Sequence, residues 1–148
     1  MAHNIKINNN MRKIKFRAKV KMPEKRNFAR QEYVPEGQWV YGEPHTIDCP
    51  TPHIHTVDVG KQPIDKETIC QFTSLYDRNK KEIYEGDLLK FWDDDTGLIE
   101  VRFVRGVFAF LWQGNLDDEM PINAPTHEWA TVVGNIHDNP ELMKGGEK

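Results

Sequence analysis

The chain has 148 residues, 38% of them hydrophobic, and a net charge of −3 from 20 basic and 23 acidic side chains, a composition that excludes a disordered chain. No apolar run approaches the roughly 20 residues that cross a bilayer, and residues 1–10 lack the apolar core of a secretory signal. Two cysteines are too few for a disulfide scaffold, which favours a cytoplasmic location.

The N-terminal half shows two strand patterns separated by irregular sequence. Residues 1–10 are polar and predict a disordered leader. Apolar and basic residues then alternate over 13–19, which predicts a half-buried strand with Ile14 and Phe16 in the core. Residues 21–36 have no clean period and predict a loop. A short aromatic strand is expected at 39–41, ending in a turn at Gly42, and prolines then break the chain until alternation returns at 54–59.

The second half has a more regular pattern. A short helical turn capped by Asp65 is expected to lead into a strand near residues 70–72, followed by a polar turn at 77–81. The remaining strands are predicted at 88–92, 98–104, 107–112 and 131–136, with a terminal turn at 139–142. The acidic stretches 93–97 and 117–119 are interpreted as a hairpin turn and a solvated loop.

Strands at about ten-residue spacing, with Gly and Asp turns between them, predict a mainly β protein. We expect a small curled sheet or SH3-like barrel in the C-terminal half and an irregular, β-containing N-terminal part. The organisation we infer is a disordered leader at 1–10, a basic strand and insertion-tolerant region at 11–67, the small β-barrel at 68–143 and a flexible tail at 144–148.

Four segments of the chain carry a resemblance to a known family. The longest, residues 71–87, reads QFTSLYDRNKKEIYEGD, and the others are MRKIKFRA at 11–18, WVYG at 39–42 and GNIHDNPEL at 134–142. On these motifs the chain resembles the YopX family of phage and prophage proteins. Ser74 and Lys80 stand where the family usually has glycines, and residues 22–63 match poorly.

The resemblance implies a mainly β fold and a phage or prophage origin, and it supplies no catalytic residue. The sequence also lacks a Ser-His-Asp order, a Walker A loop and a dinucleotide-binding glycine motif. We therefore expect no catalytic residues, no enzymatic activity and no cofactor.

The segment around Gly86 has turn chemistry. Glycine at 86 can adopt a positive φ, and Asp87 can accept hydrogen bonds from nearby backbone amides, so the two predict a tight turn that starts a strand. The alternative is a carboxylate pair, Glu85 and Asp87, for acid–base work or metal binding, but the spacing provides no third partner. We assign Gly86, Asp87 and Gly134 to structural turns.

Potential metal ligands gather in the proline-rich segment: His45, Cys49, His53 and His55. An H-x-H pair on a strand projects both imidazoles to one face, which is half of a zinc site. The spacing matches no structural zinc pattern. Two interpretations stay open, a metal site made by these four side chains and surface histidines in a variable segment.

The net charge conceals an uneven distribution. Residues 1–30 carry ten basic side chains and one acidic one, a net charge of +9, whereas residues 31–148 carry −12. Five basic side chains share one face of the first predicted strand, about 6.6–6.8 Å apart: Lys13, Lys15, Arg17, Lys19 and Lys21. They could bind nucleic-acid phosphates, or the basic segment could pack on acidic surface of its own or a neighbouring subunit. We favour the second interpretation.

The function that we predict is that of a cytoplasmic, phage-encoded accessory protein that acts by binding and self-association as a homo-oligomer. One alternative is a nucleic-acid-binding protein that uses the basic strand, and another is a metal-binding module or hydrolase that uses the His/Cys cluster. A phage or host protein is a further candidate partner, and we expect no membrane partner.

Overall fold

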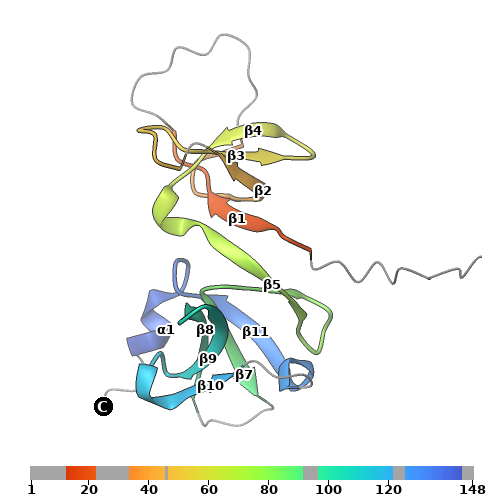
Figure 1. Ribbon diagram of the computed structural model, residues 1–148, viewed down its shortest axis with the longest axis vertical. Helices are drawn as coiled ribbons and strands as arrows, with labels where there is room; N and C mark the ends of the chain where they lie inside the picture. Colours follow the sequence, from red (N-terminus) through yellow and green to blue (C-terminus); the bar gives the residue numbers. More distant parts are fainter. Residues whose placement is uncertain (1–12, 23–33, 46, 92–96, 122–125, 145–148) are drawn as a thin grey trace, which may run out of the picture.

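The computed structural model of the protein describes residues 13–22, 34–45, 47–91, 97–121 and 126–144. They form two antiparallel sheets, seen as two lobes in Figure 1. The first sheet has the strand order β4-β3-β2-β1-β5-β6 and the second the order β10-β9-β8-β7-β11. The prediction of a mainly β protein is confirmed.

The first sheet contains β1 (Phe16–Lys19), β2 (Trp39–His45), β3 (His53–Thr56), β4 (Gly60–Pro63), β5 (Cys70–Tyr76) and β6 (Glu82–Tyr84). The second contains β7 (Asp87–Phe91), β8 (Ile99–Val104), β9 (Val107–Trp112), β10 (Glu119–Pro121) and β11 (Ala130–Asn135). Four short helices complete the description: η1 (Lys66–Thr68), η2 (Leu116–Asp118), η3 (Thr126–Trp129) and α1 (Pro140–Lys144).

The N-terminal part is more regular than we expected. One face of β1–β4 is apolar and buries a core made of Ala18, Val20, Val40, Ile54 and Ile64. An isolated antiparallel bridge joins Val20 to Ile64, so the chain after β4 returns to the end of β1. Val20 and Ile64 form this bridge and also belong to the core. The sheet therefore curls around the core, which buries their apolar side chains.

The turn predicted at Gly42 is wrong. β2 continues through Gly42, which lies opposite Phe16 of β1, and on through Glu43 and Pro44, which pair with β3. A Cβ on Gly42 would overlap the backbone carbonyl oxygen of His55 and lie 2.7 Å from its carbonyl carbon. Glycine is needed here because β2 and β3 approach closely, and not because the chain turns.

The C-terminal half forms a curled sheet and not a barrel. Within the described residues no pairing joins the edge strands β10 and β11. The outer edge of β11 is covered instead by the β5–β6 turn. The Val132 amide donates to the Asp77 carboxylate at 3.0 Å, and the Arg78 amide donates to the Ala130 carbonyl at 2.9 Å. These two bonds satisfy an amide and a carbonyl on the edge of β11 that faces away from β7.

Strands β5 and β6 connect the two sheets. We grouped them with the C-terminal half, and they hydrogen-bond within the first sheet. Their apolar residues Leu75 and Ile83 nevertheless pack into the core of the second sheet, with Leu89, Val101 and Phe110. One hairpin therefore belongs to both lobes, and its burial stabilises their relative position.

Most local predictions in the second half are confirmed. η1 is capped by Asp65, whose carboxylate accepts from the Glu67 amide at 3.1 Å. Strands β5, β7, β8, β9 and β11 lie close to the predicted positions, whereas β6 was not predicted. The acidic stretch 117–119 contains the end of η2 and the start of β10, which we missed, and the terminal turn continues as α1. The leader 1–10, residues 93–96 of the acidic turn, residues 23–33 of the loop and residues 145–148 of the tail lie outside the described residues.

Ser74 and Lys80 have φ values of 68° and 65°, in the left-handed region that favours glycine. A side chain is strained in this region, so we expect Lys80→Gly to raise the free energy of unfolding by about 0.5–1 kcal/mol in urea denaturation. Its exposed neighbour Lys81 is not among the residues with positive φ, and Lys81→Gly is the matched control that should lower stability. Equal effects of the two substitutions would contradict the strain.

Candidate functional site

The guanidinium of Arg17 lies where β1 of the first sheet meets β7 of the second. Its Nη2 donates to Asp87 Oδ1 at 2.6 Å, and the two side chains are 7% and 1% exposed. The guanidinium also lies 4.5 Å from the ring centre of Trp39 and 4.7 Å from that of Tyr84. One buried ion pair and two aromatic faces therefore hold Arg17, and these contacts compensate for the hydration that the guanidinium loses on burial.

The turn at residues 84–87 positions Asp87 for this pair. Gly86 has a φ of +84°, and the second carboxylate oxygen of Asp87 accepts from the Tyr84 amide at 2.8 Å. The geometry is the tight turn that we predicted for Gly86 and Asp87. Burial raises the pKa of Asp87, while the charge of Arg17 opposes that rise.

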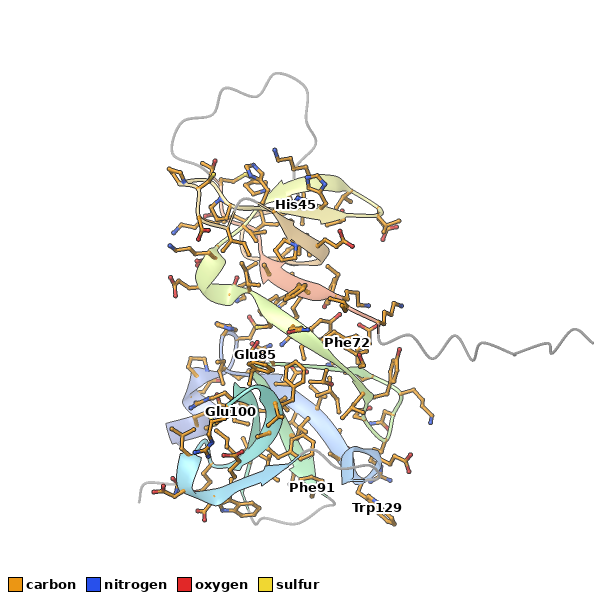
Figure 2. All side chains as sticks on the ribbon, in the orientation of Figure 1. His45, Phe72, Glu85, Phe91, Glu100 and Trp129 are labelled. Carbon is orange, nitrogen blue, oxygen red and sulfur yellow. The ribbon has the colours of Figure 1, made fainter. Side chains whose placement is uncertain are left out.

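The proposed carboxylate pair of Glu85 and Asp87 is divided between two environments. Asp87 is bound to Arg17, whereas the charged neighbours of half-buried Glu85 are Arg102 and Glu100. Burial first, and Glu100 to a lesser degree, raise the pKa of Glu85. Glu100 is buried and accepts from Arg102 at 2.8–3.1 Å. Figure 2 shows Glu85 near β5 and Glu100 further into the second lobe.

A thiol and an imidazole meet beside Arg17. Cys70 Sγ lies 3.5 Å from His137 Nε2. Burial raises the pKa of the Cys70 thiol to about 11, although Arg17 favours the thiolate. Burial and the charge of Arg17 both lower the pKa of His137. Near neutral pH both groups are uncharged, so this pair lacks the thiolate that a cysteine nucleophile requires.

The titration of Cys70 predicts an alkaline loss of stability. The pKa of Cys70 in the folded protein lies above the ordinary thiol value of 9.0. The contribution of the buried thiol to the free energy of unfolding is therefore complete below pH 9 and is lost as pH rises toward 11. Each pH unit in this window lowers the free energy of unfolding by at most about 1.4 kcal/mol. Urea denaturation at pH 8 and about pH 10 measures the loss. Cys70→Ala should flatten this part of the profile, whereas Cys49→Ala, at an exposed thiol, should leave it unchanged. If Cys70→Ala leaves the dependence of the free energy of unfolding on pH unchanged, the thiol of Cys70 is not the group that causes the loss.

A second polar group closes the junction on the side of β11. Asp138 forms an ion pair with Lys19, accepts from the Trp39 indole nitrogen at 2.8 Å, and accepts from Asn135 at 3.0 Å. Burial opposes ionisation of Asp138, but these hydrogen bonds outweigh it and lower its pKa to about 2. The Trp39 ring also contacts the His137 ring edge-on at 5.8 Å. β2 is thereby attached to the segment after β11.

The five basic residues of the first strand have different surroundings. Lys15, Arg17 and Lys19 form ion pairs with Glu82, Asp87 and Asp138, all from the C-terminal half, whereas Lys13 and Lys21 are exposed. Ile14, which we expected in the core, is 65% exposed. The central position of the basic face is buried because a second sheet covers it, and alternation alone could not indicate that.

The histidines and the cysteine of the candidate metal site divide into two places. His45 lies opposite His53 on β2 and β3, and the His45 and His55 rings stack at 4.1 Å. Cys49 lies in the loop after β2 and lines a separate pocket. Among the residues that the structure describes, no three His, Cys, Asp or Glu side chains form a group that could hold a metal ion. The Nδ1 atom of His53 is buried without a hydrogen-bond partner.

Gly134 lies within β11, at the register shift that follows Val132, and not in the turn that we expected. A Cβ there would lie 2.5 Å from Asn139 Oδ1, and that oxygen accepts from the Asn135 amide at 3.3 Å. The glycine allows residues 135–139 to fold back closely on the strand. That fold positions His137 and Asp138 beside Trp39.

Sequence reasoning did not identify Trp39, Tyr84, His137 and Asp138 as members of one site. The signal that could have found them is the set of four motif segments, because each contributes to this junction: Arg17, Trp39, Tyr84 with Asp87, and Asp138. No local spacing joins segments that are 70 to 99 residues apart.

No helix in the described part of the chain is long and apolar enough to span a membrane. No curated protein is matched by the sequence. The model of one family, described as YopX protein, matches residues 4–144 and so includes all four segments that meet around Arg17. The chain therefore belongs to the YopX family.

Proposed function

We propose that the chain is a phage- or prophage-encoded accessory protein of the cytoplasm that acts by binding and self-association, without catalysis. The observation that carries the proposal is the end of the β8–β9 hairpin, here called the tip and defined as residues 102–108. β7 pairs with β8 only at Ile99 and Glu100, and β10 pairs with β9 only as far as Ala109. Within the described residues the tip is therefore a two-stranded ribbon with no strand beside it.

Each face of the tip carries one pair of apolar side chains. Phe103 lies opposite Phe108 on one face, and Val104 lies opposite Val107 on the other. Phe103 is 48% exposed and Val107 is 51% exposed. A two-stranded ribbon is marginally stable alone in water, and apolar groups on such a projection are typical of a surface that a protein partner covers.

The junction supports a role without catalysis. Its cysteine and histidine are neutral near pH 7, and its buried carboxylate is bound to Arg17. These groups stabilise the contact between two sheets. The ion pairs of Lys15, Arg17 and Lys19 with acidic side chains of the same chain also favour the self-complementary interpretation of the basic segment over nucleic-acid binding.

Light scattering on the full chain at increasing concentration tests the proposal. We expect a mass above the 17.3 kDa of one chain, and we expect Phe103→Ser to shift the equilibrium toward one chain. Val57→Ser, at a fully exposed valine in the β3–β4 turn, is the matched control and should change nothing. A mass of one chain at every concentration would contradict self-association.

A nucleic-acid titration tests the alternative that uses the exposed Lys13 and Lys21. Binding through phosphates should weaken steeply with salt and should weaken further in Lys13→Ala. Absence of binding to a single-stranded oligonucleotide at low salt would eliminate this alternative.

A further inference from the structure

The outer face of strands β2 and β3 carries three histidines that the junction does not use. Directly paired residues of antiparallel strands have their side chains on the same face of a sheet, and His45 lies opposite His53. His55 follows two residues after His53 on β3 and therefore lies on that face as well. Val40 and Ile54 alternate with these residues and belong to the core of the first lobe. The histidines thus lie on the side of the sheet that faces away from this core.

His45 and His55 form a close pair of exposed rings. Their ring centres are 4.1 Å apart and their planes are inclined by 27°, whereas the Nδ1 atom of His53 is buried. Zinc binds imidazole nitrogen at about 2.0–2.1 Å, and tetrahedral geometry then places two nitrogen ligands about 3.3–3.4 Å apart. A small rotation of the two exposed rings brings their nitrogen atoms to that spacing. The pair therefore provides two of the four ligands of a zinc site.

The other two ligands of such an ion lie on the solvent side of the sheet. His45 and His55 are both exposed, so the remaining coordination positions of an ion that they bind point away from the chain. A second copy presents the same two imidazoles on the same face. Two copies related by a two-fold axis then supply four nitrogen ligands, a donor type that suits zinc.

The charges beside the histidine pair favour contact between two copies. Within strands β2, β3 and β4, which the structure describes in full, Glu43 is the acidic residue and Lys61 the basic one, apart from the histidines. They lie opposite His55 on its two sides, Glu43 on β2 and Lys61 on β4. A two-fold axis parallel to the strands exchanges these sides, so that Glu43 of each copy lies toward Lys61 of the other. Face-to-face contact therefore brings opposite charges together.

We propose that His45 and His55 of two copies together bind one zinc ion and so join the copies across the outer faces of β2 and β3. The inference goes beyond the proposed function, because this contact depends on a metal ion and lies in the first lobe, whereas the tip lies in the second (Figure 1). Figure 2 shows His45 in the first lobe, away from Glu100 in the second. Cys49 and His53 are not ligands in this site.

Titration of the full chain with zinc chloride tests the proposal. The chain is first treated with EDTA and dialysed, and calorimetry then measures how many zinc ions bind. We expect one ion for two chains, and sedimentation equilibrium should show that zinc doubles the mass and that EDTA reverses the change. The Phe103→Ser chain separates this contact from the tip, and zinc should convert it from one chain to two.

Substitution of the two histidines tests the ligands. His45→Gln and His55→Gln each remove two of the four ligands of the shared ion, because both copies lose one. Each should weaken the zinc-dependent association constant by about tenfold or more. Both positions are exposed, so urea denaturation without zinc should show that each variant remains folded. The controls are His3→Gln, outside the described residues, and Cys49→Ala, at an exposed thiol, and both should bind zinc as the unsubstituted chain does.

The outcomes separate this inference from the proposed function. One zinc ion for two chains, a mass that doubles, and loss of both in His45→Gln and His55→Gln would support the shared site. One ion for each chain without a change in mass, zinc binding that both variants retain, or no zinc binding would overturn it. The mass in EDTA tests the tip alone. A mass of one chain in EDTA that zinc doubles would contradict the proposed self-association through the tip and support the zinc site.

Discussion

Replacing Asp87 by alanine is expected to lower the free energy of unfolding by about 3–5 kcal/mol, measured by urea denaturation at neutral pH. The Asp87 side chain is 1% exposed, and its loss leaves the charge of Arg17 buried between two aromatic rings without a counter-ion. It also leaves the Tyr84 amide without its acceptor. Both effects are large because neither group can reach water without opening the junction.

Two further variants make this result specific. The double substitution Arg17→Met with Asp87→Leu removes both charges and should recover the part of the lost stability that comes from the unpaired Arg17 charge, whereas the Tyr84 amide still lacks its acceptor. Lys15→Met breaks an ion pair whose side chains are 23% and 29% exposed, and it should cost about 1 kcal/mol or less. Equal losses for Asp87→Ala and Lys15→Met would mean that water screens the Arg17–Asp87 pair.

Gly42→Ala is the second substitution with a large expected effect, a loss of about 3 kcal/mol or more in the free energy of unfolding. The added Cβ would overlap the His55 carbonyl oxygen, which belongs to backbone and cannot rotate away. The substitution must separate β2 from β3, and β3 contributes Ile54 to the core of the first lobe. Thermal and urea unfolding both measure the loss.

Gly37→Ala is the matched control for Gly42→Ala. Gly37 has a φ of +86° and no atom within 4 Å of an added Cβ, so alanine there meets backbone strain alone. That strain should cost about 1 kcal/mol. If the two alanines cost the same, close approach of the strands is not what requires glycine at position 42.

The junction explains why motifs spread over the whole chain belong together. Arg17, Trp39, Tyr84 and Asp138 come from four separated segments, and each contacts at least one other. Their shared role is to hold two sheets against each other by a buried ion pair, aromatic faces and an indole hydrogen bond. The outer surfaces, the tip among them, are then free to differ in what they bind.

The strands of the second half were predictable because their signal is local. Residues 107–112 are nearly continuous apolar sequence between turns, and η1 has a capping aspartate in front of it. Gly86 and Asp87 were interpreted correctly for the same reason, since a tight turn depends on the conformations of adjacent residues.

Arg17 shows what alternation could not indicate. The pattern of residues 13–19 placed it on a polar face with lysines, and that face is polar in composition. Its burial arises only because Asp87, 70 residues later, supplies a counter-ion within a second sheet. Gly42 and Gly134 are similar cases, because the atoms that would meet their Cβ come from another strand or from a segment that folds back.

By itself, then, the sequence determined the mainly β class, most strand positions, the turn at 86–87 and the division of charge between the two ends of the chain. Only the tertiary structure decided which strands share a sheet and that the second sheet curls without closing. It also decided that acidic side chains of the same chain form ion pairs with the basic strand. The physical reason is range. Backbone preferences and alternation act over a few neighbouring residues, whereas ion pairing, sheet edges and close approach depend on groups that folding brings together.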